Sequence, residues 1–242
     1  MKILGIIPAR FGSTRFPGKP LVDIDGKTMI QRVYEQAKNC SALTDVIVAT
    51  DDERIFNEVI RFGGKVVMTS TLHQSGTDRC AEVVNKLTEK YDVIINIQGD
   101  EPFIDPKQIT QLCNCFLDEK TQIATLTKSI TDQADLFNEN KVKVTFNTNY
   151  FAIYFSRNAI PFFRGETHEN WLKKHNYFKH IGIYGYKIEI LKEIALLKPS
   201  KLELAEGLEQ LRWIENGYNI KIAETGLEAI SIDTPEDVAK LK

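Results

Sequence analysis

Apolar, Val- and Ile-rich runs that alternate with amphipathic helical segments are the feature that most limits how this chain can fold. The runs 45–50 and 92–98 are almost continuously apolar, whereas the segment 28–40 repeats apolar residues such as Met29 and Val33 at helical spacing. Strands that are apolar on both faces and separated by helices form a parallel sheet that helices cover on both sides. We therefore expect an α/β protein with a Rossmann-like, mostly parallel central sheet.

The second half of the chain has a different rhythm, with aromatic, β-prone runs and little helix between them. This pattern predicts a more antiparallel portion, followed by one helix over 201–217 that Gly217 ends. We expect one domain over 1–242, with a nucleotide-binding core at about 1–130 and 220–242 and a β-rich sugar-binding part at about 131–219. The strands predicted in this half are 141–147, 150–157, 177–188, 219–225 and 228–233.

Charge and composition exclude several classes of protein. The net charge of −2 gives no support to a general role in binding nucleic acid or membrane surfaces, which favour a basic excess. No apolar run approaches the roughly 18 residues of a membrane helix, and the apolar start is too short for a signal peptide. The cysteines have no metal-site or redox spacing, so we expect reduced thiols in a cytoplasmic protein; they are Cys40, Cys80, Cys113 and Cys115.

The segment 6–21, which reads IIPARFGSTRFPGKPL, follows the first expected strand and concentrates cations, glycines and hydroxyls. It matches neither the Walker loop nor the G-x-G-x-x-G pattern, because five residues separate Gly12 from Gly18 and Pro20 follows Lys19. Its chemistry still suits a polyphosphate, although a solvated basic turn is the simpler alternative. The groups that would bind phosphate are Arg10, Ser13, Thr14, Arg15 and Lys19.

Seven segments, in order from Ile6 to Val238, together resemble the 3-deoxy-manno-octulosonate (Kdo) cytidylyltransferases. They are IIPARFGSTRFPGKPL, ATDD, HQSGTDR, INIQGDEP, KHIGIYGY, LEQLR and IDTPEDV, and they span nearly the whole chain. CMP-sialic acid synthetases are similar in the first segment but are not expected to share the HQSGT and LEQLR segments. The resemblance implies a nucleotidyltransferase fold, a homodimer, and Mg²⁺-dependent transfer of CMP from CTP to the anomeric hydroxyl of an acidic eight-carbon sugar. Pyrophosphate would leave, and the product would serve lipopolysaccharide synthesis.

The same resemblance assigns roles to residues that lie far apart in the chain. It implies that Asp100 and Asp233 hold Mg²⁺, and that Arg10 and Lys19 act with them in catalysis. The residues implied to bind CTP are Arg10, Ser13, Thr14, Arg15, Lys19, Ser75, Gly76 and Thr77. Those implied to bind the sugar are Gln98, Arg157, Arg164, His180, Tyr184, Glu209 and Gln210.

Several of these residues have an ordinary structural interpretation. Asp233 precedes a helix start and could be its N-cap, but Thr234 can fill that position with Asp237 closing a capping box, which would leave the Asp233 carboxylate free at a strand end. A lone histidine or tyrosine on an apolar strand is usually a core residue. Strand alternation nevertheless places His180 and Tyr184 on one face, as a polar and aromatic sugar pocket requires. Glu209 and Gln210 could equally belong to a solvated helix face.

The chain departs from the family pattern in places, and other functions stay open. The surroundings of Arg164 and the residue Lys201 are atypical, so 8-amino-Kdo or another acidic sugar such as sialic acid is an alternative substrate, while Asp78 in place of the more usual Glu is a mild change. A metal-dependent glycosyltransferase would use a D-x-D triplet, and the one at 23–25 reads better as a turn. A non-catalytic sugar-nucleotide-binding regulator would lack the metal carboxylate or the loop lysine, and both are present.

Overall fold

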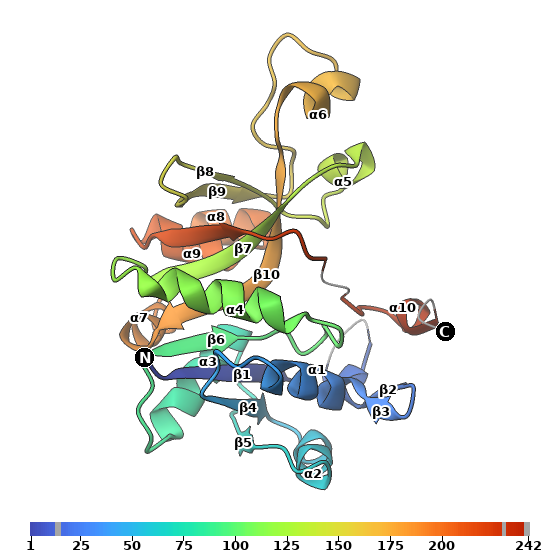
Figure 1. The fold of residues 1–242 in the computed structure, drawn as a ribbon, viewed down its shortest axis with the longest axis vertical. Helices are drawn as coiled ribbons and strands as arrows, with labels where there is room; N and C mark the ends of the chain where they lie inside the picture. The colour runs from blue at the N-terminus through green and yellow to red at the C-terminus, as the bar shows by residue number, and fades with distance from the viewer. Residues whose placement is uncertain (13–15, 229–230, 240–242) are drawn as a thin grey trace.

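The computed structural model describes residues 1–12, 16–228 and 231–239, and its centre is a twisted sheet (Figure 1). The strands lie in the order β11-β7-β10-β6-β1-β4-β5, and every neighbouring pair is parallel except the two that contain β10. This arrangement confirms the predicted α/β fold with a mostly parallel sheet. The bounds are β1 Ile3–Ala9, β4 Asp45–Thr50, β5 Val66–Met68, β6 Val93–Asn96, β7 Ile123–Ser129, β10 Phe178–Lys187 and β11 Ile220–Glu224.

Helices cover both faces of this sheet and create two apolar cores. On one face, α1, α2 and α4 bury side chains such as Val33, Val59 and Leu112 against the strands. On the other face, α3, α7 and α9 bury Val83, Leu191 and Trp213. The bounds are α1 Met29–Lys38, α2 Glu53–Arg61, α3 Gly76–Lys86, α4 Pro106–Asn114, α7 Ile188–Ile194, α8 Lys201–Glu206 and α9 Gln210–Glu215. None of the helices in the described residues is long and apolar enough to cross a membrane.

The β-rich part adds an antiparallel extension and a projecting arm. The hairpin of β8 (Lys143–Phe146) and β9 (Ala152–Ser156) joins the main sheet through β10, as the predicted antiparallel strands require. The arm, residues 157–177, carries the short helix α6 (Trp171–Lys174) and rises beyond the hairpin and α5 (Gln133–Phe137) in Figure 1. A small apolar cluster packs Trp171 and Tyr177 of the arm with Ile130 and Leu136.

Short elements complete the fold. A two-strand ribbon of β2 (Asp23–Ile24) and β3 (Lys27–Thr28) follows the first loop, and the Asp23 carboxylate accepts a hydrogen bond from the Gly26 N–H. The D-x-D triplet was predicted to be a turn; Asp23 and Ile24 instead form β2, and Asp25 lies in the turn that follows. The remaining elements are the 3₁₀ helices η1 (Lys19–Leu21), η2 (Cys115–Leu117) and η3 (His168–Asn170), and the helix α10 (Pro235–Ala239).

Two sequence-based predictions of secondary structure were wrong. The single helix expected over 201–217 is divided into α8 and α9, because Gly207 adopts a left-handed conformation (φ 62°) and its N–H closes α8 on the Glu203 carbonyl. A strand was expected at 228–233, but residues 231–233, at the described end of this segment, are irregular. In addition, β7 was not anticipated, because its sequence IATLTKS mixes polar with apolar residues.

Candidate active site

A cleft of about 270 Å³ opens at the carboxyl edge of the parallel strands. Its walls come from the ends of β1 and β6, the loop before α3, η1 and the segment before α10, at the sheet edge where ligands bind in open α/β sheets. The lining residues are Pro8, Ala9, Arg10, Lys19, Pro20, His73, Gln74, Ser75, Gly76, Arg79, Gln98, Gly99, Asp100 and Asp233.

Two glycines allow the cleft loops to pass close to the end of β1. A Cβ atom on Gly99 would lie 2.7 Å from the Pro8 carbonyl oxygen, closer than real side chains approach. A Cβ atom on Gly76 would lie 3.3 Å from the Pro8 ring, which is tight but less severe. The position of Asp100 therefore depends on the missing side chain at Gly99.

Three charged residues from separate segments meet at one side of the cleft. The Lys19 Nζ atom lies 2.8 Å from Asp100 Oδ2 and 3.3 Å from Asp233 Oδ1, and the lysine side chain is only 13% exposed. These contacts join residues that are 81 and 214 positions apart in the sequence. The two carboxylates that the family resemblance paired are thus brought to a common point.

The segment before α10 is attached to the loop after β6. The Ile232 N–H donates to the Asp100 carbonyl over 2.9 Å, and the buried Ile232 side chain packs with Ile24 and Met29. At the helix start, the Asp237 carboxylate accepts hydrogen bonds from the N–H groups of Asp233 and Thr234. The Asp237 carboxylate thus bonds the Thr234 N–H, as the predicted capping box requires. Asp233 was expected to be free at a strand end, but it lies in a loop and is ion-paired with Lys19.

The donor set of this corner fits a hard divalent cation. Mg²⁺ prefers oxygen ligands and is usually held by one or two carboxylates together with substrate phosphates. Asp100 and Asp233 supply two such carboxylates around one point that already attracts a cation, the Lys19 ammonium. Within the described ranges, no group of three or more potential metal-ligating side chains occurs. Asp100 and Asp233 are the residues here that could hold such an ion.

The opposite end of the cleft is built by the start of α3. Ser75 is its N-cap, and a capping box with Asp78 fixes this turn, with the Ser75 hydroxyl accepting from the Asp78 N–H. Thr77 is buried and its hydroxyl donates to Glu209 Oε2 over 3.0 Å. Of the other residues assigned to CTP, Arg10 is exposed at the cleft, while Ser13, Thr14 and Arg15 lie outside the described residues.

The residues assigned to the sugar do not all lie together. Gln98 lines the cleft, whereas Glu209 and the buried Gln210 lie at the start of α9. Burial raises the pKa of Glu209, although hydrogen bonds with Thr77 and Ser75 act to lower it. Arg157 donates to the carbonyls of Glu206 and Gly207. Arg164 lies exposed on the arm and does not line the cleft.

His180 and Tyr184 project to the same face of β10, as strand alternation predicted. Their rings lie 5.2 Å apart, and His180 Nε2 lies 2.9 Å from the Thr125 hydroxyl. Burial lowers the pKa of His180 to about 3, so this histidine is neutral near pH 7. It lines a second cavity of about 320 Å³ beside Glu101, Lys141 and Lys179.

Sequence reasoning missed the buried charges that support the cleft. Arg79 is almost fully buried and pairs with Asp51, and the Glu82 carboxylate, from one turn further along α3, contacts His73. Burial, and then the charge of Asp100, raise the pKa of Glu101 to about 7. The signal available in the sequence was weak: Arg79 and Glu82 are three residues apart on one helix face, a spacing that solvated helices also show.

Comparison with known proteins agrees with this geometry. A family model described as cytidylyltransferase matches residues 4–222. A 3-deoxy-manno-octulosonate cytidylyltransferase of Parabacteroides distasonis is 59% identical and covers 99% of this chain and 96% of its own length. The enzyme of that name from Bacteroides thetaiotaomicron is 58% identical and covers 98% of this chain and 96% of its own length.

Solved structures show the same relationship. A CMP:2-keto-3-deoxy-manno-octonic acid synthetase complexed with CTP is 43% identical and superimposes with a TM-score of 0.92, covering 100% of this chain and 97% of its own. A putative glucose-1-phosphate thymidylyltransferase of Bacillus anthracis is 20% identical and superimposes with a TM-score of 0.63, covering 99% of this chain and 93% of its own. This likeness shows the fold alone. With close relatives matched from end to end, and a cleft where a lysine meets two carboxylates, this chain belongs to the 3-deoxy-manno-octulosonate cytidylyltransferases.

Proposed function

We propose that this protein transfers CMP from CTP to the anomeric hydroxyl of 3-deoxy-D-manno-octulosonate, releasing pyrophosphate, and that the product serves lipopolysaccharide synthesis. The observation that carries the proposal is the meeting of Lys19, Asp100 and Asp233 in the cleft of a chain that superimposes on a CTP-complexed synthetase. Direct transfer needs no covalent enzyme intermediate. Positioning and charge stabilisation therefore account for the catalysis.

The charged corner of the cleft would hold the triphosphate. Asp100 and Asp233 are the residues that would hold Mg²⁺, which when bound neutralises phosphate charge and orients the α-phosphate for attack. Lys19 is held beside these carboxylates and can donate to phosphate oxygens, and Arg10 adds a second cation at the cleft mouth. Ser13, Thr14 and Arg15 stay predicted contacts of the same loop.

The sugar would enter from the side of Gln98, towards α9 and β10. Gln98 lines the same cleft as Asp100 and Asp233, and Glu209, bonded to Thr77 at the start of α3, and the buried Gln210 can bind hydroxyls. Tyr184 and His180 line the β10 face that continues this path, and the neutral His180 ring accepts or donates a hydrogen bond without adding charge. Arg157 and Arg164 stay predicted contacts of the sugar carboxylate.

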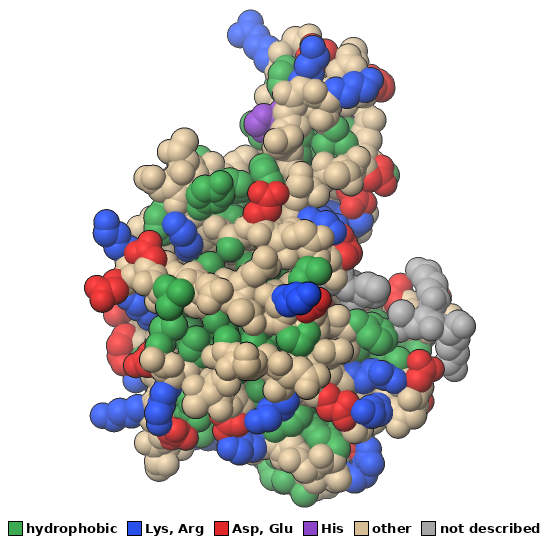
Figure 2. Space-filling model, in the orientation of Figure 1, with side chains coloured by type: hydrophobic (Ala, Val, Ile, Leu, Met, Phe, Trp, Pro, Cys, Tyr) green, Lys and Arg blue, Asp and Glu red, His purple; other side chains and the backbone are tan. Residues whose placement is uncertain are grey.

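We further propose a homodimer that covers the β8–β9 hairpin and the arm. Large apolar side chains are exposed there, with Ile153 58% and Phe162 73% exposed, and green apolar atoms lie at the surface over the hairpin in Figure 2. Ile153 also borders a cavity of about 710 Å³ between the hairpin and the arm. Light scattering should give twice the chain mass, and a monomer for Ile153→Lys would support this surface.

We place the protein in the cytoplasm, in keeping with its free cysteines.

The activity is tested by pyrophosphate release from purified protein with Mg²⁺, CTP and one sugar at a time: Kdo, 8-amino-Kdo or sialic acid. We expect release with Kdo. Asp100→Asn and Asp233→Asn should each reduce turnover at least about 100-fold while the protein stays folded. Asp23→Asn is the matched control, because this aspartate is exposed in the D-x-D triplet. Failure with every acidic sugar refutes the proposal, and selective release with another sugar changes the substrate.

A further inference from the structure

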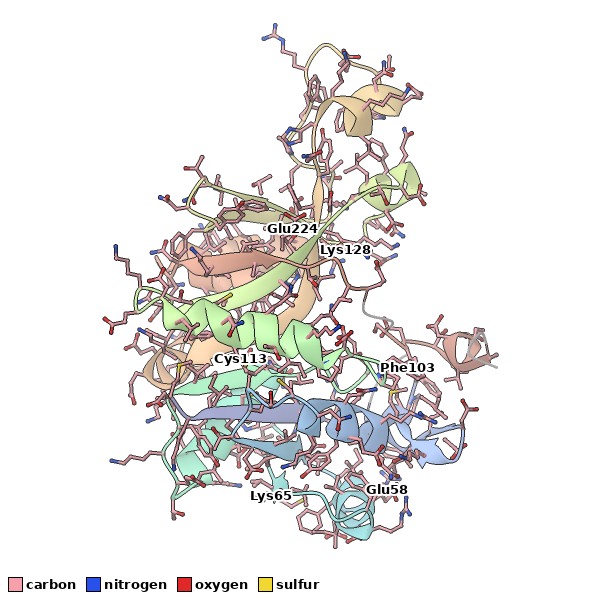
Figure 3. The ribbon with its side chains drawn as sticks, in the orientation of Figure 1. Glu58, Lys65, Phe103, Cys113, Lys128 and Glu224 are labelled. Carbon is pink, nitrogen blue, oxygen red and sulfur yellow. The ribbon has the colours of Figure 1, made fainter. Side chains whose placement is uncertain are left out.

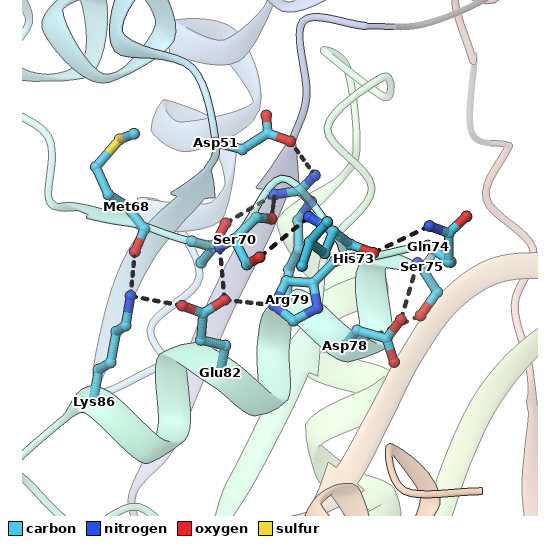
Figure 4. A network of polar contacts seen from close by, with 12 residues as sticks. Asp51, Met68, Ser70, His73, Gln74, Ser75, Asp78, Arg79, Glu82 and Lys86 are labelled. Carbon is cyan, nitrogen blue, oxygen red and sulfur yellow. Dashed lines mark hydrogen bonds and ion pairs between the residues drawn. The ribbon is translucent and has the colours of Figure 1, made fainter. Parts of the chain in front are cut away.

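The ATDD segment, residues 49–52, joins the end of β4 to the start of α2. Asp51 pairs with the buried Arg79, as Figure 4 shows, and this contact fixes the backbone at the turn. Asp52 is the N-cap of α2 and accepts the Arg54 N–H over 2.9 Å. The first turn of α2 is therefore held in place, and this helix packs beside η1.

Asp52 also orients the Arg54 side chain. Its carboxylate accepts from Arg54 Nε over 2.9 Å and from Arg54 Nη2 over 2.6 Å, and these two bonds fix the plane of the guanidinium. The hydrogen bonds from Arg54 lower the pKa of Asp52, so this carboxylate stays charged near pH 7. The Arg54 Cζ atom lies 3.3 Å from the centroid of the Phe11 ring. The oriented cation therefore covers one face of that ring.

The Phe11 ring in turn packs against the backbone of Gly18. A Cβ atom on Gly18 would lie 3.1 Å from two carbons of the ring, and the Gly18 N–H donates to the Phe11 carbonyl over 2.9 Å. Gly18 has a left-handed φ of 74° and directly precedes η1. Phe11 and Gly18 thus form a neck that joins the end of β1 to the start of η1.

The two cations of the cleft lie on either side of this neck. Arg10 directly precedes Phe11, Lys19 directly follows Gly18, and both cations line the cleft. Consecutive Cα atoms are only about 3.8 Å apart, so residues next to a hydrogen-bonded pair stay close to one another. The neck therefore limits the distance between the two cations. Cations whose spacing is fixed in advance bind a polyphosphate more tightly, because less entropy is lost in ordering them.

We propose that the Phe11 ring, covered by Arg54, is a positioning group that presets the two cleft cations for a polyphosphate. This inference rests on the proposed use of CTP, and it gives the ATDD segment a part in binding the phosphates through Asp52. Neither Phe11 nor Arg54 lines the cleft, so both act through the neck.

The test measures binding of inorganic tripolyphosphate and of CTP by calorimetry, with Mg²⁺ and without the acceptor sugar. Phe11→Leu removes the ring and should weaken the binding of each about five- to tenfold. Arg54→Leu keeps the ring and also keeps the helix cap, because Asp52 caps through the backbone N–H. It should weaken binding about two- to fivefold. Phe11→Tyr keeps an aromatic face for the guanidinium and should bind as the wild type does.

A second measurement distinguishes positioning from a general loss of stability. In a protein that carries Lys19→Met, one of the two preset cations is absent, so their spacing no longer matters. Phe11→Leu should then weaken binding less than about twofold. An equal factor with and without Lys19→Met overturns the inference, because Phe11 would then act independently of the lysine. If Phe11→Leu is unfolded in the assay, Arg54→Leu makes the same comparison, since Arg54 is exposed.

Arg61→Leu is the matched control. Arg61 is also an exposed arginine of α2 that makes two hydrogen bonds to a carboxylate, each 2.7 Å, in this case to Glu58 (Figure 3). It is the last residue of α2, at the end of the helix away from Arg54. Its binding of tripolyphosphate should equal that of the wild type. A loss as large as that of Arg54→Leu overturns the inference, because the removal of any surface charge would then explain both.

The outcomes separate this inference from the proposed function. Tripolyphosphate binding that depends on Phe11, without pyrophosphate release from CTP with any sugar, supports the inference and refutes the proposed reaction. Release with Kdo, together with unchanged binding in Phe11→Leu and Arg54→Leu, overturns the inference alone. A wild-type protein that binds neither tripolyphosphate nor CTP overturns both.

Discussion

Replacing Gly99 with alanine should damage stability and activity together. The added Cβ would lie 2.7 Å from the Pro8 carbonyl oxygen, whereas ordinary contacts begin at 3.4 Å, so the β6 loop or the end of β1 must move by about 0.7 Å, the difference between the two distances. Overpacking of this kind costs about 1–3 kcal/mol of unfolding free energy. For a domain of this size the melting temperature should fall by about 2–12 °C.

The same displacement reaches the corner of the cleft where Lys19, Asp100 and Asp233 meet, because Asp100 is the next residue. A misplacement approaching 1 Å can cost about 100-fold in rate, so we expect Gly99→Ala to lose about 10- to 100-fold in kcat/KM. Calorimetric melting and pyrophosphate release measure the two effects. Gly226→Ala is the control, since no atom lies within 4 Å of its added Cβ and its φ is not in the left-handed region. Wild-type melting and turnover in Gly99→Ala would refute the close-approach argument.

Three further predictions concern the charged and buried groups of the site. Lys19→Met should lose at least about 100-fold in kcat/KM. Mg²⁺ should raise the melting temperature of this variant more than that of the wild type, because Asp100 and Asp233 no longer have the Lys19 ammonium beside them. An equal rise in the two proteins contradicts this prediction. His180 has a pKa of about 3 when folded and about 6.5 when unfolded, so the unfolded chain binds more protons and stability is lost as pH falls between these values. Denaturant titrations at pH 7.5 and 5 should show a smaller loss for His180→Gln than for the wild type. Thr77→Val should cost about 1–3 kcal/mol of unfolding free energy, because it removes the hydrogen bond from buried Thr77 to Glu209. It should also raise KM for the sugar more than for CTP. An unchanged sugar KM would separate Glu209 from sugar binding.

Local pattern was enough to identify most of the elements that carry the site. The apolar runs that became β1 and β6 and the amphipathic segment that became α1 follow from side-chain periodicity, which acts over a few residues. The pattern failed where a single residue or a partner strand decided the outcome. Gly207 divides α8 from α9 by its left-handed backbone, and β7 is a strand because β10 and β11 pair with it on either side.

The charged residues of the site show the same division. Lys19 and Asp100 were recognisable as candidates because each follows a predicted strand, and strand ends in a parallel sheet share one edge. Nothing in the sequence stated which carboxylate meets which cation. The commitment of Arg79 to Asp51 was equally hidden, since whether a charged side chain faces water, a ligand or a buried partner depends on the packing around it.

Local pattern therefore predicted the class of fold, most of the strands and helices that carry the site, and a set of polar residues at strand ends, because these depend on interactions between near neighbours. Only the packing of the sheet and its loops brings Lys19 between Asp100 and Asp233, and Glu82 into contact with His73. Those contacts join segments that the chain brings together only when the sheet is complete, and burial then sets the charges and protons of the groups that meet there.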